Sequence, residues 1–363
     1  MSEHPRHRWA LVAGLLLLAP TVGEFLLGNI PVSQYASVLV LVPLYGAGAL
    51  LVREAARRLG GGWPTIALFA AAYALVEEGP VDQMVFNPGY LDLPSFAGYG
   101  DVPGLHVSLT LVVWSLALHT IWSICVPIAL VEAFDPEPTR PWLGRTGLVV
   151  TAAVFVAGCV FLAVVQAQDL DFVGTPTQFV ASTVAIMALV AAGVAVRSRH
   201  AAADPRPAPP PWVAGVLASA LTSAYWMISD PPFDAALRVT VATGGFVVAA
   251  VVGVLLVRRW SRRRGWDGRH RLALAIGAGC TYALWFGPSQ AHEAGTGMTE
   301  TVVGALVFGG GFVLLAVLAA RRQMRRVIPR DRASERRSAP RWQGDAKAYW
   351  ASVEHRQRRQ GGC

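Results

Sequence analysis

Residues 147–166 read GLVVTAAVFVAGCVFLAVVQ, a run of twenty residues without a charged side chain. A helix of this length rises about 30 Å, the thickness of the hydrocarbon layer of a bilayer. The rest of the 363-residue chain is similar, because 54% of it is hydrophobic and only 15% is charged. A soluble protein has roughly a quarter of its residues charged. The composition therefore excludes an ordinary soluble enzyme and predicts a polytopic membrane protein.

Ten mostly apolar segments predict an all-α polytopic membrane helix bundle of about ten transmembrane helices. The predicted spans are residues 9–27, 35–52, 63–86, 105–131, 147–166, 178–196, 212–229, 237–257, 272–287 and 301–320. Prolines beside tryptophans, as in Trp63-Pro64 and Pro211-Trp212, are typical of helix ends at a membrane interface.

The distribution of basic residues predicts the orientation. When the N-terminus is cytoplasmic, alternate crossings place all of the 31 Lys and Arg residues except Arg238 on the cytoplasmic side. This arrangement satisfies the positive-inside rule, so we expect both termini in the cytoplasm and an even number of spans in the cell (inner) membrane. The net charge of +8 then reflects topology, and no nucleic-acid partner is expected.

Composition also suggests four parts of the chain. Residues 1–200 hold membrane helices one to six, and the proline-rich segment 201–211, AAADPRPAPPP, predicts a cytoplasmic linker. Residues 212–320 hold membrane helices seven to ten. The basic tail 321–363 is expected to be disordered in the cytoplasm or to lie on anionic inner-leaflet lipids. Its role and the oligomeric state are left open.

The four cysteines, Cys125, Cys159, Cys280 and Cys363, have neither the spacing of a disulfide framework nor that of a zinc site. Three of them lie inside apolar spans.

Ionisable residues inside predicted spans converge on one depth. At about 1.5 Å per helical residue, Glu24, Glu77 and His119 each lie about 20 Å above the inner edge, with Glu78 one residue beyond Glu77. Such groups are costly in hydrocarbon and usually mark functional sites. We therefore predict a polar site in the outer third of the membrane, formed by helices one, three and four.

The sequence around this layer supports a cavity. Gly79-Pro80 interrupts the third span before it has crossed, and irregular backbone at membrane depth must be covered by protein or water. We therefore expect a polar cavity open to the outside. Candidate supporting side chains follow the break and line one face of helix four: Asp82, Gln83, Asn87, Tyr90, Ser115, Ser123 and the flanking Trp122.

Two glutamates and a histidine fit three mechanisms. One glutamate could act as general base for a hydrolytic water while His119 orients it or stabilises an oxyanion. The same carboxylates could load and unload a proton in an ion- or proton-coupled transporter. Glu77, Glu78 and His119 could also bind one divalent metal, or the site could use no cofactor. A non-catalytic membrane scaffold is the remaining alternative.

The pair Glu77-Glu78, followed 41 residues later by His119, resembles the glutamate-dependent intramembrane endopeptidases of the CAAX-processing and bacteriocin-processing (CPBP) family. The likeness covers residues 63–131 and implies catalytic roles for these three residues. The family's EExxxR reads EEGPVDQ here, and Ser123 stands where the family has Asn. As a whole, the chain resembles uncharacterised multi-pass membrane proteins of actinobacteria, a similarity that implies no activity.

Overall fold

The computed structural model describes residues 5–92, 95, 99–196, 204–229 and 235–338. Within them, nine helices are long and apolar enough to cross a membrane. They are His7–Phe25, Val32–Arg58, Leu109–Glu132, Arg145–Asp169, Pro176–Val196, Pro211–Ile228, Val239–Ser261, Gly268–Glu293 and Met298–Arg325. Each matches one predicted span, so the predicted all-α polytopic membrane bundle is confirmed.

The remaining predicted span, residues 63–86, forms a shorter helix. Its α-helical part is Trp63–Val76, and a single π-helical turn, Glu77–Val81, continues it without a gap. Pro80 ends the regular hydrogen bonding here, because a proline has no N–H to donate.

Most of the described chain is helical. The α-helices are α1 (Pro5–Pro20), α2 (Val38–Leu41), α3 (Ala47–Arg58), α4 (Trp63–Val76), α5 (Leu109–Leu118), α6 (Val126–Glu132), α7 (Arg145–Asp169), α8 (Pro176–Val196), α9 (Pro211–Ser229), α10 (Ala235–Ser261), α11 (Gly268–Thr281), α12 (Gly287–Glu293), α13 (Met298–Gly304) and α14 (Gly310–Ser338). Two 3₁₀ segments, η2 (Val32–Ser37) and η5 (Pro88–Leu91), and two short strands, β1 (Asp204–Pro207) and β2 (Arg263–Arg264), complete the described part together with the π-helical turns below.

Six π-helical turns interrupt the membrane helices. They are η1 (Thr21–Phe25), η3 (Val42–Gly46), η4 (Glu77–Val81), η6 (His119–Cys125), η7 (Tyr282–Phe286) and η8 (Ala305–Gly309). Such turns are rare and occur frequently at functional sites, because they reorient side chains within an otherwise regular helix.

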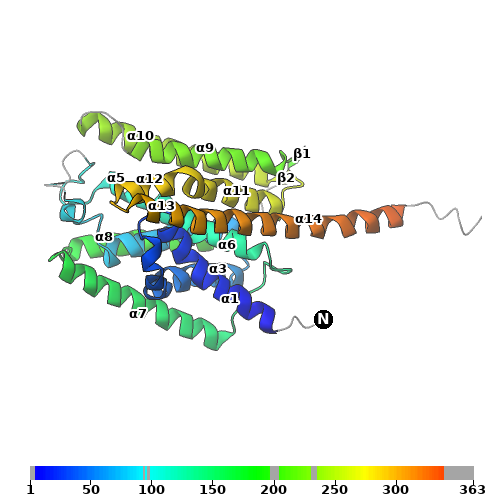
Figure 1. Ribbon diagram of the computed structural model, residues 1–363, viewed down its shortest axis with the longest axis horizontal. Helices are drawn as coiled ribbons and strands as arrows, with labels where there is room; N and C mark the ends of the chain where they lie inside the picture. The colour runs from blue at the N-terminus through cyan, green and yellow to red at the C-terminus, as the bar shows by residue number, and fades with distance from the viewer. Residues whose placement is uncertain (1–4, 93–94, 96–98, 197–203, 230–234, 339–363) are drawn as a thin grey trace, which may run out of the picture. The chain divides into compact units, whose positions relative to one another are not determined.

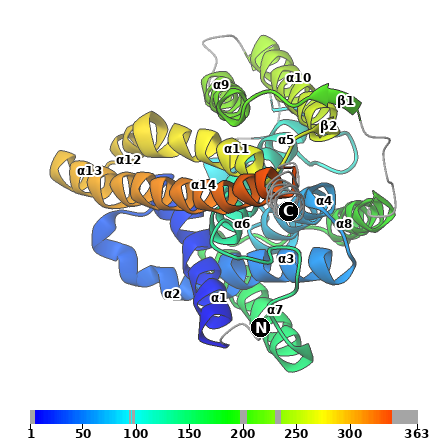
Figure 2. The same ribbon diagram turned by 90° about the vertical axis from the view of Figure 1, so that its right-hand side faces the viewer.

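The helices differ sharply in how much of their surface other helices cover. Half of the most apolar window of Val32–Arg58 and of Leu109–Glu132 is buried, against 6% for α7 and for α8. Figures 1 and 2 show α7 and α10 on opposite sides of the bundle, with α6 and α11 between them. The exposed valines and leucines of the outer helices therefore face lipid, and the core lies around α1, α3, α4, α6 and α11.

The predicted linker contains structure. Its residues Asp204–Pro207 form β1, which pairs with β2 in the connection between α10 and α11 (Figure 2). His270 Nε2 also lies 2.9 Å from the carbonyl oxygen of Pro209. The segment thus contacts the α10–α11 connection and the first turn of α11, within the second helix group.

Contacts divide the chain into two units, Met1–Ala320 and Arg321–Cys363. The described part of the second unit is the end of α14, which continues to Ser338. Residues 339–363 of the predicted disordered tail lie outside the described residues, and its placement on lipid stays a prediction.

Candidate functional site

His119 lies between the two carboxylates of the Glu77-Glu78 pair. Its Nε2 is 2.7 Å from Glu78 Oε1, and its Nδ1 is 2.9 Å from Glu77 Oε2. Nδ1 is also 3.0 Å from the hydroxyl oxygen of Ser123, one helical turn further on. The predicted convergence of helices three and four is thus present, and we call Glu77, His119 and Glu78 the acid–imidazole triad.

Local backbone geometry explains how adjacent residues reach one ring. In a regular helix, neighbouring side chains point about 100° apart, which would direct only one of two adjacent glutamates at His119. Both glutamates lie at the start of the π turn η4, and His119 starts the π turn η6. The widened turns bring both carboxylates to opposite sides of the imidazole.

A hydrogen-bonded pair, Glu24 and Tyr45, lies next to the triad. The Tyr45 hydroxyl donates to Glu24 Oε1, and the Asn29 side-chain amide donates to Glu24 Oε2 at 3.1 Å. The ring centroids of Tyr45 and His119 are 6.1 Å apart. Glu24 therefore reaches the site through Tyr45, as part of the predicted polar layer.

Glycines let the tyrosines of the site approach neighbouring backbone. A Cβ added at Gly23 would lie 2.9 Å from Tyr45 Cε1 and 3.2 Å from Ser123 Oγ. A Cβ added at Gly48 would lie 2.3 Å from Tyr73 Cε2. Both contacts are closer than side chains allow, so these two positions require glycine for the observed packing.

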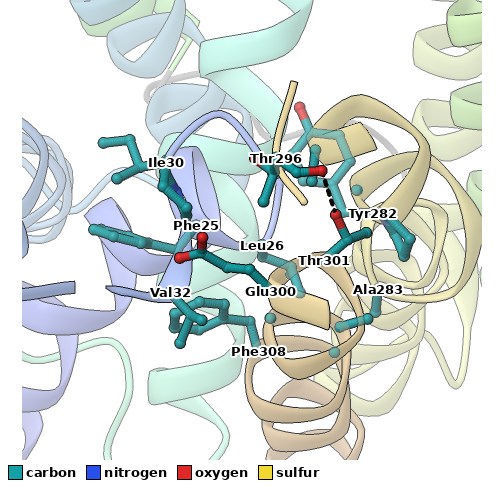
Figure 3. Close-up of a pocket in the computed structure, with 18 residues that line it drawn as sticks. Phe25, Leu26, Ile30, Val32, Tyr282, Ala283, Thr296, Glu300, Thr301 and Phe308 are labelled. Atoms are coloured by element: carbon teal, nitrogen blue, oxygen red, sulfur yellow. Dashed lines mark hydrogen bonds between the residues drawn. The ribbon is translucent and has the colours of Figure 1, made fainter. Parts of the chain in front are cut away.

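The triad is closed off from the surface. Glu77 has no exposed area, and Glu78 and His119 are each 4% exposed. The predicted cavity open to the outside is therefore wrong for this structure, because the three groups pack against one another. The pocket in Figure 3, of about 30 Å³, lies elsewhere, beside η1, η7, α13 and η8, and is lined by residues such as Phe25, Tyr282 and Glu300.

Several predicted supporting residues have other partners. Gln83 Oε1 accepts from the backbone N–H of Gly174 at 2.7 Å, and Asn87 caps η5 by accepting from the N–H of Gly89. The Ser115 hydroxyl donates to the carbonyl of Val112 within its own helix. These contacts hold loops and helix ends in place.

Trp122 faces away from the triad, toward α11. Its indole N–H donates to the carbonyl of Ala278 at 2.9 Å, and its ring stacks on Tyr282 with centroids 4.5 Å apart. Asp82 is half-buried at the end of η4, where its backbone N–H binds the carbonyl of Glu77. Tyr90 packs on a small cluster around Phe86.

The prediction did not include Tyr45 and Tyr73, whose rings lie 6.5 Å apart beside the triad. Both tyrosines carry a hydroxyl group inside an apolar span, and this was the one feature of the sequence that could have indicated a place in the site. It is weak, because a tyrosine is common in membrane helices near interfaces.

A second buried polar cluster was also missed. Arg53 is completely buried, with Nη1 2.8 Å from Glu54 and Nε 3.0 Å from Glu132. Arg57 forms two contacts with the same Glu132 carboxylate, at 2.7 and 3.0 Å. Trp142 covers Arg53, whose guanidinium carbon is 3.4 Å from the centre of the ring.

This ionic cluster pairs acids with arginines. Three arginines, Arg53, Arg57 and Arg58, meet three acids, Glu54, Glu132 and Asp135. The backbone N–H groups of Trp142 and Leu143 donate to Glu54, and the Arg53 guanidinium donates to the carbonyls of Pro138 and Arg140. The cluster joins α3, α6 and the segment after α6 at the membrane face where the prediction places the basic loops.

The described residues do not support the predicted divalent metal in the triad. Among them, no group of three or more His, Cys, Asp or Glu side chains is arranged to hold a metal ion. Both ring nitrogens of His119 already face carboxylates, whereas a metal ligand must present a free nitrogen lone pair. A metal ion could bind His119 only if one of its contacts with Glu77 and Glu78 were broken.

The fold and this site define a multi-pass helical membrane protein with buried acid–base groups. The chain belongs to a family described as an uncharacterized membrane protein family, whose model matches residues 13–326. The match runs across the predicted linker, so the family model covers residues of both helix groups. No curated protein and no solved structure matches the chain.

Proposed function

We propose that this protein is a proton-coupled membrane transporter in which the acid–imidazole triad takes up and releases the coupling protons. The observation that carries the proposal is the position of the His119 ring, which contacts two carboxylates while all three groups are almost fully buried. We further propose that it resides in the cell membrane with both termini in the cytoplasm.

Charge counting explains why protons are the natural cargo of the triad. With both glutamates ionised and His119 doubly protonated, the three groups carry a net charge of −1. Among the described residues, the charged groups that interact with Glu78 are His119, Glu77 and Asp82, and no arginine is among them. An unbalanced charge in a low-dielectric interior is expensive. One further proton makes the triad neutral, so proton number and local charge are tightly coupled.

The ionic cluster offers a contrast within the same chain. There, each acid is paired with arginines, which stay charged in proteins. The triad has only one basic group, and that group is an imidazole, the side chain that most readily changes its charge near neutral pH. Its charge can therefore follow the proton supply while the ionic cluster stays fixed.

The closed state of the site also favours transport. A transporter that alternates between two faces of a membrane must pass through states in which its binding site is shielded from both. The four helices that supply Glu24, Tyr45, the glutamate pair and His119 each break into a π turn at these residues. Such turns change register with little loss of hydrogen bonding, which suits helices that move against one another.

An intramembrane hydrolase is the second candidate, and one observation favours it. Within the described residues, neither oxygen of the buried Glu77 carboxylate has an aligned hydrogen-bond donor. Such a carboxylate could accept a proton from a water, as the resemblance to the glutamate endopeptidases implies. This candidate needs an opening for a peptide substrate next to three groups that are almost completely buried.

A pH jump on reconstituted protein tests the proposal without knowledge of the transported substrate. Proteoliposomes adsorbed on a solid-supported membrane should show a transient charge displacement when the outer pH is stepped. Glu78→Gln and His119→Gln should remove this displacement, because each leaves the triad with one proton-binding group fewer. Glu293→Gln, which changes an exposed acid on α12, is the matched control and should behave like wild type.

The outcomes separate the candidates. Equal charge displacement in wild type and in Glu78→Gln would refute the transporter proposal. Absent displacement in wild type, together with uncut membrane proteins that accumulate in cells carrying Glu77→Gln, would assign the site to hydrolysis. A scaffold would tolerate both Glu77→Gln and His119→Ala in every assay. Monodisperse elution in detergent shows that each variant is folded.

A further inference from the structure

Glu24 is more accessible than the two glutamates of the triad. It is half-buried, whereas Glu77 and Glu78 are almost inaccessible. Its Oε2 accepts from Asn29, whose own side-chain oxygen lies 3.5 Å from Gln290 Nε2 on α12. Polar side chains therefore lead from the surface loop after η1 to Glu24.

Tyr45 continues this line inward. Its hydroxyl donates to Glu24 Oε1, and its ring is 5% exposed and lies beside His119. The Tyr45 ring and the Ser123 hydroxyl both lie next to Gly23, since a Cβ added there would be 2.9 Å from Tyr45 Cε1 and 3.2 Å from Ser123 Oγ. Ser123 in turn contacts His119 Nδ1. The side chains between Glu24 and the triad are thus hydroxyl groups, which both accept and donate protons.

Several other ionisable groups face Glu24 from the elements packed around it. The groups that interact with it electrostatically are Tyr45 from η3, Glu77 from η4, Asp82 after η4, Tyr90 from η5, His119 from η6 and Tyr282 from η7. Most are acids or phenols, and His119 is the basic group among them. The charge of Glu24 is therefore coupled to the protonation of the triad.

Within the described part of the chain, the opposite end of the same helices shows no such line of groups. Arg53 lies at the end of the helix that contains Tyr45, and Glu132 ends the helix that contains His119. Both are buried in the ionic cluster, whose charges are paired and shielded. In this conformation the side chains that can exchange protons lead toward Glu24 and not toward the ionic cluster.

We propose that Glu24 is the proton-loading group of the triad and that Tyr45 relays the proton between them. This inference rests on the proposed function and adds the route of the proton. Glu24 takes a proton from the aqueous phase and passes it to the Tyr45 oxygen, while the proton that Tyr45 held moves on to the triad beside it. Glu24 is then a carboxylate again, Tyr45 is neutral and the triad holds one proton more.

The pH-jump measurement on full-length proteoliposomes tests this route through its kinetics. Glu24→Gln and Tyr45→Phe should slow the charge displacement about a hundredfold, the usual contribution of a positioned proton-transfer group. The total displaced charge should stay that of wild type, because the triad itself is intact. Glu293→Gln again serves as control. Tyr45→Phe keeps the ring that packs against Gly23, so it separates loss of the hydroxyl from loss of packing.

Rescue of the rate by a weak acid distinguishes a relay from a purely structural role, because a weak acid can replace a missing proton donor but cannot repair a packing defect. Formate or azide in the buffer carries protons to a site that has lost its relay, and should restore the rate of Glu24→Gln toward that of wild type. An unchanged rate in Glu24→Gln or Tyr45→Phe, or a slow rate that neither acid restores, would overturn the relay. If Glu78→Gln abolishes the displacement in the same experiments, the transporter proposal stands even though the relay has failed.

Discussion

Replacement of Arg53 by methionine should strongly destabilise the protein. Arg53 has no exposed area and contacts Glu54, Glu132, two backbone carbonyls and the face of Trp142. Methionine has a similar length and fills most of the space, so the change tests charge and hydrogen bonding more than volume.

The expected magnitude follows from the partners that remain. Removal of one member of a buried ion pair costs about 3–5 kcal/mol. Glu132 keeps both contacts with Arg57, and Glu54 keeps the N–H groups of Trp142 and Leu143. The loss should therefore lie at the lower end, about 3 kcal/mol, which lowers the folding equilibrium constant more than a hundredfold.

Unfolding by sodium dodecyl sulfate in mixed micelles, followed by circular dichroism, measures this change. Arg140→Met is the matched control, because Arg140 is 67% exposed and pairs with the half-exposed Glu137. Exposed ion pairs contribute about 0–1 kcal/mol. The reasoning would be refuted if Arg53→Met lost no more stability than Arg140→Met. Arg53→Lys should fall between them, since an ammonium keeps the charge but cannot reproduce the planar fork of donors.

Two further predictions concern packing and a helix cap. Gly48→Ala places a methyl group 2.3 Å from Tyr73 Cε2 and should cost about 1–3 kcal/mol through overpacking; Gly244→Ala, with nothing within 4 Å, should be neutral or slightly stabilising in the same thermal melts. Asp267→Ala removes the N-cap of α11, where Asp267 accepts from the N–H of Arg269, and should cost about 1 kcal/mol. Burial opposes the charge on Asp267, but its hydrogen bonds with His270 and Arg269 prevail and lower its pKa. The contribution of this carboxylate is therefore present above its ordinary pKa of 3.8 and is lost as the pH falls through the lower folded value. Melting temperatures of wild type and Asp267→Ala should converge at acid pH, and a constant difference would contradict the assignment.

Depth in the membrane could be predicted from the sequence because the rise of a helix is constant. Counting residues from the inner end of each span placed Glu24, Glu77 and His119 at one level, and in the structure the His119 ring lies beside both Glu77 and Tyr45, the partner of Glu24. Counting residues gives height but not rotation, and Trp122 was assigned to the site although its ring faces α11. The open cavity was predicted from the Gly79-Pro80 break in the third span, whereas in the structure protein covers this region and the triad is buried.

The ionic cluster shows what remained hidden. Arg53 and Arg57 end a predicted span, where arginines are expected to contact lipid headgroups or water. Their partner Glu132 lies 75 residues or more along the chain and ends another span. Each residue alone is consistent with a solvated interface. Only the packing of α3 against α6 shows that they are buried together.

Membrane insertion, the positions of the nine long helices in the described residues and the level of the polar groups depend on composition and local periodicity, and the sequence by itself determined them. The closure of the triad, the proximity of Tyr45 and the buried arginines depend on how helices rotate and approach each other. Those choices arise from glycine contacts and π turns, which act between segments distant in the chain. The tertiary structure alone decided that the acids of this protein meet an imidazole at one end and arginines at the other.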